Sequence, residues 1–158
     1  MTDPDTQALL ESFAAAPGIL RRAIADLDPR SYDRSPSAGE WTPRQIVRHM
    51  ADTETLGALC FRLTIAQQQP ILPLYDQEAW AGNLDYAQDD PATLAEAIEL
   101  FALLRAASAR LLASLPPEGW ARAADHPRRG RITVRDLLEM YTNHAQGHLD
   151  QLRRSAIA

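Results

Sequence analysis

Apolar residues recur at intervals of three and four along four segments of the sequence, and no segment alternates between apolar and polar residues. Recurrence at three and four is typical of amphipathic α-helices, whereas alternation would indicate half-buried β-strands. The chain has 158 residues, enough to bury one hydrophobic core without disulfides. We therefore expect an all-α fold, with residues 1–158 forming a single domain built as a four-helix bundle.

Capping residues mark the expected helix ends. The second helix should begin at Thr42 as N-cap, with Pro43 at the first helical position and Gln45 completing a capping box, and should end near Gln69. The first segment runs from about Thr6 to Leu27, and Pro17-Gly18 should kink it or split it. The third helix should follow Asp90-Pro91 and stop before Pro116, and the fourth should begin at Thr133 with Asp136 as its capping-box partner.

Long connections are expected after the second and third helices. The first of them, from Pro70 to Asp90, has about 20 residues, a length that in a compact domain often has a functional role.

The overall charge and the cysteine count exclude several classes of function. A net charge of −5 offers no electrostatic attraction for nucleic acid. Cys60 is the only cysteine, so no internal disulfide and no cysteine cluster for zinc is possible. The acidic, polar N-terminal segment has no signal-peptide pattern, and no window approaches the roughly 20 apolar residues of a membrane span. We expect a cytoplasmic protein that acts on a small molecule.

Two of the four histidines lie in the segment "NHAQGHLDQLRR", residues 143–154. His144 and His148 are four residues apart and share a helix face with apolar residues of the same stripe, so both should point inward. Such a pair suits convergence on one metal ion. Solvated histidines, or core histidines bonded to carbonyls, are the simpler alternatives. Two unpaired inward imidazoles would each carry a desolvation cost of a few kcal/mol, which favours a shared ligand.

His49 lies on the inward stripe of the second helix, beside Ile46 and Met50, and provides a third candidate ligand. His126, in a loop rich in proline and arginine, is expected to be exposed. Three neutral histidines with one open position are typical of a catalytic rather than a structural metal site. Zn²⁺ or Ni²⁺ suits them best, with Fe²⁺ or Mn²⁺ as alternatives. Such a metal would activate a water for hydrolysis or hold a low-molecular-weight thiol as thiolate.

The stretches "EWTPRQIVRHMADTE" and "RRGRITVRDLLEMYTNHAQGHLDQL", with "LYDQEAW" and "LPPEGWAR" between them, resemble the DinB/YfiT-like superfamily. The resemblance runs from about Phe13 to Arg153. It implies a four-helix bundle of up-down-down-up connectivity with a metal held by His49, His144 and His148. It also implies a homodimer. YfiT-like members often have a further histidine beside the last ligand, where this chain has Gly147.

Superfamily members include thiol-dependent enzymes that use mycothiol or bacillithiol, proteins described as metal-dependent hydrolases, and many proteins without a known activity. The leading hypothesis is therefore a metal-dependent enzyme, a thiol-dependent S-transferase or a hydrolase, that acts on a small electrophile. A non-catalytic metal-binding protein associated with stress responses is the main alternative, because no general base is evident. An interaction module that uses an exposed helix face is a third possibility.

Several polar residues are candidates for supporting or catalytic roles near the histidines. Asp52, Asp76, Tyr141 and Glu54 are possible acceptors for the second ring N–H of a ligand histidine, although surface or packing roles fit them equally well. Arg105 interrupts the apolar stripe of the third helix, and Arg62 is expected in the same region. We expect Arg105 to be buried in an ion pair with Asp52, Glu54 or Asp76; anchoring of a substrate carboxylate is the alternative. Trp80 is expected at the mouth of the pocket.

Overall fold

The computed structural model describes residues 3–88 and 90–155 and confirms the four-helix bundle. Its long helices are α1 (Pro4–Ala25), α2 (Pro43–Ala66), α4 (Pro91–Ala113) and α5 (Val134–Ser155). The connections hold a short helix, two 3-10 turns and two short strands: α3 (Gln77–Asn83), η1 (Pro29–Ser31), η2 (Pro117–Ala121), β1 (Ala123–His126) and β2 (Gly130–Thr133).

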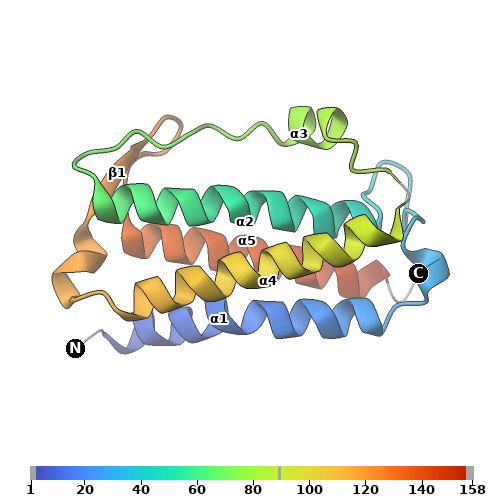
Figure 1. Cartoon of the computed structure of the whole chain (residues 1–158), viewed down its shortest axis with the longest axis horizontal. Coiled ribbons are helices and arrows are strands. Elements are labelled where there is room, and N and C mark those ends of the chain that lie inside the picture. Colours follow the sequence, from blue (N-terminus) through green and yellow to red (C-terminus); the bar gives the residue numbers. More distant parts are fainter. Residues whose placement is uncertain (1–2, 89, 156–158) are drawn as a thin grey trace.

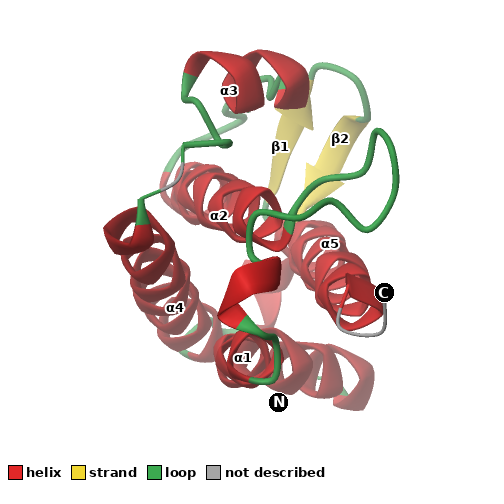
Figure 2. Cartoon of the chain, turned by 90° about the vertical axis from the view of Figure 1, so that its right-hand side faces the viewer, coloured by secondary structure: helices red, strands yellow, loops and turns green. Residues whose placement is uncertain are grey.

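The four long helices surround one core, with α1 diagonally opposite α2. Both α1 and α2 pack against α4 and α5, as the end-on view in Figure 2 shows. Residues 67–88, the crossover segment, return along the outside of the bundle, so α4 runs in the same direction as α2 (Figure 1). The connectivity is therefore up-down-down-up. The crossover segment and the β1–β2 hairpin both lie on the side of α2 and α5 that faces away from α1.

The helix ends follow the capping residues predicted from the sequence. Thr42 accepts a hydrogen bond from the Gln45 amide, and the Gln45 side chain accepts one from the Thr42 amide at 2.9 Å. Asp90 caps α4 with its side chain, which accepts a hydrogen bond from the Ala92 amide at 2.9 Å. At the start of α5 the Thr133 hydroxyl and the Asp136 carboxylate cap each other's backbone amides. These bonds satisfy amides that a helix leaves without internal partners, which is why local sequence determines the ends.

The structure adds detail to three sequence-based predictions. The first helix is not split, since it continues through Pro17, which is itself buried. The chain is predominantly helical, as predicted, and it also contains a short antiparallel hairpin formed by β1 and β2. Each strand has four residues and neither alternates between buried and exposed positions, so no pattern of period two marked them. The connection after α2 also contains α3, whose N-terminus Asp76 caps.

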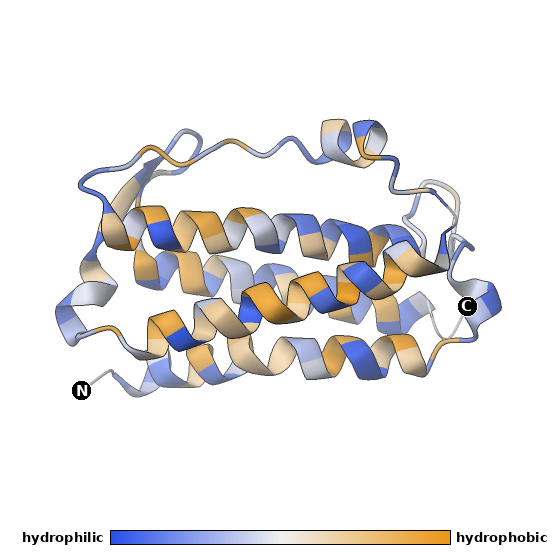
Figure 3. Ribbon diagram, in the orientation of Figure 1, coloured by the Kyte–Doolittle hydropathy of each residue, from blue (hydrophilic) through white to orange (hydrophobic). Residues whose placement is uncertain are grey.

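Hydrophobic residues are concentrated on the four long helices, whereas the connection between α1 and α2 is mainly hydrophilic (Figure 3). Two groups of buried side chains form the core, one toward each end of the bundle; the first includes Met50 and Leu149, and the second includes Phe61 and Leu137. No helix in the described part of the chain is long and apolar enough to cross a membrane.

Candidate metal centre

His49 from α2 meets His144 and His148 from α5 where the two helices face each other. One ring nitrogen from each of the three histidines lies within 4.8 Å of the other two. The Nε2 atoms of His49 and His144 are 3.0 Å apart, and the ring of His148 is 4.6 Å from each of the other two rings, centre to centre. His49 is fully buried, and the other two are half-buried. The helical stripes thus bring together the three histidines that the sequence selected.

The outer nitrogens of two of these rings have their own hydrogen-bond partners. Nδ1 of His49 lies 2.8 Å from the hydroxyl of Tyr75 in the crossover segment. Nδ1 of His148 lies 3.0 Å from Oε1 of Gln151, one turn later on α5. Because the Gln151 oxygen can only accept, this contact places a proton on Nδ1 and leaves Nε2 of His148 free to donate a lone pair. Trp41 packs edge-to-face against His49, with ring centres 4.9 Å apart.

Burial keeps the three imidazoles neutral. Desolvation, followed by the nearby His148 and His144, lowers the pKa of His49 to about 3. Desolvation is also the largest cause for His144, whose pKa falls to about 4. The pKa of His148 is lowered by burial and partly restored by its bond to Gln151. Neutral imidazole is the state that a metal requires of its histidine ligands.

Among the described residues, the carboxylates that we predicted as acceptors for the ring N–H groups form hydrogen bonds to other groups and not to the three imidazoles. Asp52 accepts a hydrogen bond of 2.6 Å from the Tyr86 hydroxyl. Asp76 accepts from the Ala79 amide as the cap of α3. Tyr141 packs its ring on Gly57 of α2, and its hydroxyl is 4.0 Å from the Cys60 sulfur. Burial raises the pKa of Cys60, so this cysteine remains a thiol.

Arg105 is almost completely buried, as predicted, and its partner is Glu54. Its Nε donates to Glu54 Oε2 at 2.9 Å, and its guanidinium lies over the ring of Phe13 at 3.8 Å. Nη2 also reaches the carbonyl oxygen of Tyr141 at 3.4 Å. Arg105 therefore links α4 to both helices that carry the histidines. Arg62, in contrast, is exposed and bonds to Ala58 and Ser108, away from the histidines.

A cleft of about 950 Å³ opens beside the histidines, between α2, α5 and the crossover segment. His144 and Tyr75 line it together with Tyr141, and the β1–β2 turn lines it farther along. His126 of this turn is half-buried and borders the cleft, so the prediction that it is exposed was wrong. Trp80 packs on Tyr75 and lines a second hollow of about 570 Å³ on the other side of that tyrosine.

Sequence reasoning missed Tyr75 and Gln151, the two hydrogen-bond partners of the rings. Gln151 lies three residues after His148, a spacing that places both on one helix face and was a usable signal. Tyr75 lies in an irregular segment, 26 residues from His49, and no periodicity indicates where its side chain points.

Comparison with known proteins gives consistent matches over most of the chain. A family model described as the DinB superfamily matches residues 12–152. A protein of Oceanobacillus iheyensis named "putative metal-dependent hydrolase" is 29% identical over 133 residues, which cover 84% of this chain and 75% of that protein. A protein of Bacillus licheniformis with the same description is 29% identical over 139 residues, covering 87% and 77%. YfiT from Bacillus subtilis, described as having an unusual four-helix bundle topology, has a similar fold, with a TM-score of 0.84 at 24% identity over 98% of this chain and 89% of YfiT.

Proposed function

The chain belongs to the DinB superfamily, and from this premise we propose that it is a metal-dependent enzyme whose metal is held by His49, His144 and His148. The observation that carries the proposal is the convergence of three neutral imidazoles from two helices at one edge of a cleft. The names of the relatives from Oceanobacillus and Bacillus support the metal dependence.

The geometry and the chemistry of the three rings fit a divalent transition metal. Bonds of about 2.0–2.1 Å in a tetrahedral arrangement would place ligand nitrogens roughly 3.3 Å from one another. The three nitrogens lie within 4.8 Å of one another, and two of them are 3.0 Å apart, so small side-chain shifts suffice. Imidazole ligands suit Zn²⁺ and Ni²⁺, and also Fe²⁺ or Mn²⁺.

The chain's own residues would hold the ligands and shape the site. If Nε2 of His49 and of His148 held the metal, Nδ1 of His49 would donate to the Tyr75 hydroxyl and Nδ1 of His148 would donate to Gln151, and these bonds would fix both ring orientations. Trp41 covers one side of His49 and excludes water there. Three protein ligands converge among the residues that the structure describes, which would leave a position for a small molecule. A divalent metal in such a site lowers the pKa of a water or a thiol and so supplies a nucleophile at neutral pH.

Hydrolysis and thiol transfer are the two reactions that this arrangement supports. In hydrolysis, the oxygen of a water forms the new bond to the electrophilic atom of the substrate, and the leaving group departs with a proton. In S-transfer, the sulfur of a low-molecular-weight thiol forms that bond instead, the bond from the electrophilic atom to the leaving group breaks, and the leaving group takes up the proton lost by the thiol. Cys60 does not serve as the sulfur nucleophile, because its buried thiol stays protonated. The names of the relatives favour hydrolysis, which we take as the leading reaction.

The test is a turnover screen on metal-loaded protein without a purification tag. Activated esters and amides are offered alone, and alkyl halides and epoxides are offered with and without mycothiol or bacillithiol. Hydrolysis predicts saturable turnover without thiol, and S-transfer predicts turnover only with it. His49→Ala should abolish either activity, while Gln146→Ala, a change on the exposed face of α5, should not. Stoichiometric metal without turnover in any arm would favour the non-catalytic, stress-associated alternative.

A further inference from the structure

We propose that Arg128 and Arg129, in the turn between β1 and β2, form an anion-binding subsite of the cleft. The substrate would then be an elongated small molecule with an apolar middle part and a carboxylate at one end. This inference rests on the proposed function, because the other end of the molecule would lie at the three histidines.

The cleft connects the two sites. The same cavity of about 950 Å³ is lined by His144 and Tyr75 and by Arg128 and Arg129. Its wall between them is largely apolar and is formed by Leu56, Leu72, Leu137 and Met140. A ligand whose reactive group lies at the histidines would thus pass an apolar surface before it reached the arginines, and apolar groups would be buried there.

The charges along the cleft favour an anion at its arginine end. Within the described part of the chain, neither guanidinium has a hydrogen-bond or ion-pair partner. The two carboxylates that line the same cleft are already engaged, since Asp136 accepts from Thr133 and Glu139 is paired with Arg135. The turn and the start of β2 together contribute three of the chain's 16 basic residues within positions 128–131, although the net charge of the chain is −5. Concentrated positive charge in an acidic protein attracts anions locally.

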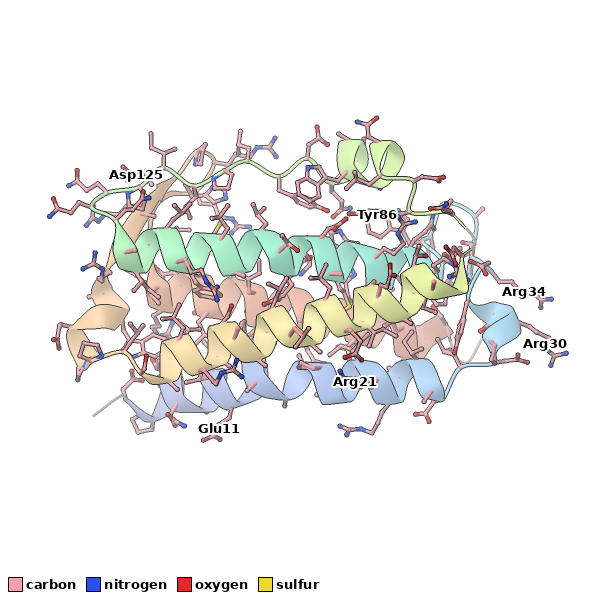
Figure 4. All side chains as sticks on the ribbon, viewed as in Figure 1. Glu11, Arg21, Arg30, Arg34, Tyr86 and Asp125 are labelled. Carbon is pink, nitrogen blue, oxygen red and sulfur yellow. The ribbon has the colours of Figure 1, made fainter. Side chains whose placement is uncertain are left out.

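Hydrogen bonds fix the backbone of this turn beside the cleft. His126 accepts the Arg128 amide on its Nδ1 at 3.1 Å and the Arg129 amide on its carbonyl oxygen at 3.1 Å. Gly130, at φ +71, supplies the left-handed conformation that closes the hairpin. The hairpin is joined to the crossover segment, because Leu72 donates to the Asp125 carbonyl oxygen and Asp125 donates to that of Pro70. Figure 4 shows Asp125 near the end of α2 where the crossover segment begins, and Tyr86 near the other end.

These contacts explain why exposed arginines would act as a subsite. The backbone that carries them is fixed by hydrogen bonds, so only the side chains lose freedom when they bind an anion. Guanidinium groups form charge-assisted, often bidentate bonds with a carboxylate. Arg128 also borders the second hollow beyond Tyr75, so its side chain lies beside both cavities.

The test compares hexanoate with hexanamide, two probes of equal length that differ in the charge of one end. Binding is measured by titration with backbone amide shifts in NMR, on metal-free protein and on zinc-loaded protein. The subsite predicts that hexanoate binds about five- to tenfold more tightly than hexanamide at low salt. It also predicts shift changes at residues 128–130 with hexanoate. Arg128→Gln/Arg129→Gln should bring the two affinities within about twofold of each other.

A matched double variant controls for the loss of net charge. Arg22 and Arg110 lie exposed on α1 and α4 and do not line the cleft, so Arg22→Gln/Arg110→Gln should keep the preference for hexanoate. Equal affinities of the two probes for the unaltered protein, or a preference that survives in Arg128→Gln/Arg129→Gln, would overturn the proposal. The metal-free arm keeps this result separate from the proposed function, whose failure would instead appear as the absence of zinc binding to the three histidines.

Discussion

The hydroxyl of Tyr75 lies 2.8 Å from Nδ1 of His49, so a residue of the crossover segment touches the side of the imidazole that faces away from the other two histidines. The contact joins the irregular segment after α2 to the candidate metal centre. It also gives that long connection a role that its length alone only suggested.

Tyr75→Phe should weaken metal binding without unfolding the protein. The change removes only the hydroxyl that lies 2.8 Å from Nδ1 of His49, and loss of such a hydrogen-bond partner of a ligand histidine typically costs about 10–100-fold in metal affinity. Competition with a chromogenic chelator measures the affinity. Tyr32→Phe is the control, because that hydroxyl bonds to the Ile24 carbonyl oxygen, away from the histidines. Equal affinities for unaltered protein and Tyr75→Phe would show that the contact does not orient His49.

The stability of the protein should be more sensitive to loss of the Glu54 carboxylate than to loss of the Arg105 guanidinium. Glu54→Leu leaves a buried guanidinium without its partner and should destabilise the protein by about 3–5 kcal/mol. Arg105→Met fills the space between Phe13 and Phe101, and with Glu54→Leu in the same chain it should restore most of that stability. Urea denaturation measures the free energies of unfolding. A double variant as unstable as Glu54→Leu alone would contradict this account of the pair.

Two helical glycines should respond to alanine in opposite directions. A Cβ at Gly57 would lie 2.7 Å from the ring of Tyr141, so Gly57→Ala should destabilise by about 1–3 kcal/mol. A Cβ at Gly147 meets nothing within 4 Å, so Gly147→Ala should stabilise by about 1 kcal/mol through helix propensity alone. Thermal and urea unfolding check both signs. Destabilisation by Gly147→Ala would show that the open space beside His148 is needed for the fold.

Lowering the pH should destabilise the metal-free protein over the range in which the three histidines bind fewer protons in the folded chain than in the unfolded chain. Their pKa values are lowered in the folded state, to about 3 for His49 and about 4 for His144, so below pH 6.5 the unfolded chain binds protons that the folded one does not. The free energy of unfolding should therefore fall as the pH drops from 7 to 5, with a limiting slope of about 1.4 kcal/mol per pH unit for each histidine. His148→Gln should make this dependence shallower. A flat profile between pH 7 and 5 would show that folding does not lower the pKa values of these rings.

The bundle and the three histidines were predictable because both depend on patterns of three and four residues. The caps at Thr42 and Thr133 act within one turn, so local sequence determined where α2 and α5 begin. The same periodicity placed His144 and His148 beside Tyr141 on the inner face.

What the sequence did not reveal depends on contacts between distant segments. Choosing Glu54 over Asp52 as the partner of Arg105 requires the rotation of α4 relative to α2, which no single helix records. The approach of Tyr75 to His49 depends on the path of an irregular segment. The hairpin depends on its bonds to Pro70 and Leu72, and its four-residue strands are too short to show a pattern.

Metal content of the untagged protein, measured by elemental analysis after dialysis against a limited excess of Zn²⁺ or Ni²⁺, tests the central claim most directly. The account predicts about one metal ion per chain, as expected for a single three-histidine site. It predicts loss of that metal in His49→Ala, His144→Ala and His148→Ala, with retention in His126→Ala, the fourth histidine. Chelation should lower the melting temperature of the unaltered protein and leave that of His148→Ala unchanged. Unaltered protein that retains no metal, or a His144→Ala variant that retains as much as His126→Ala, would contradict the account.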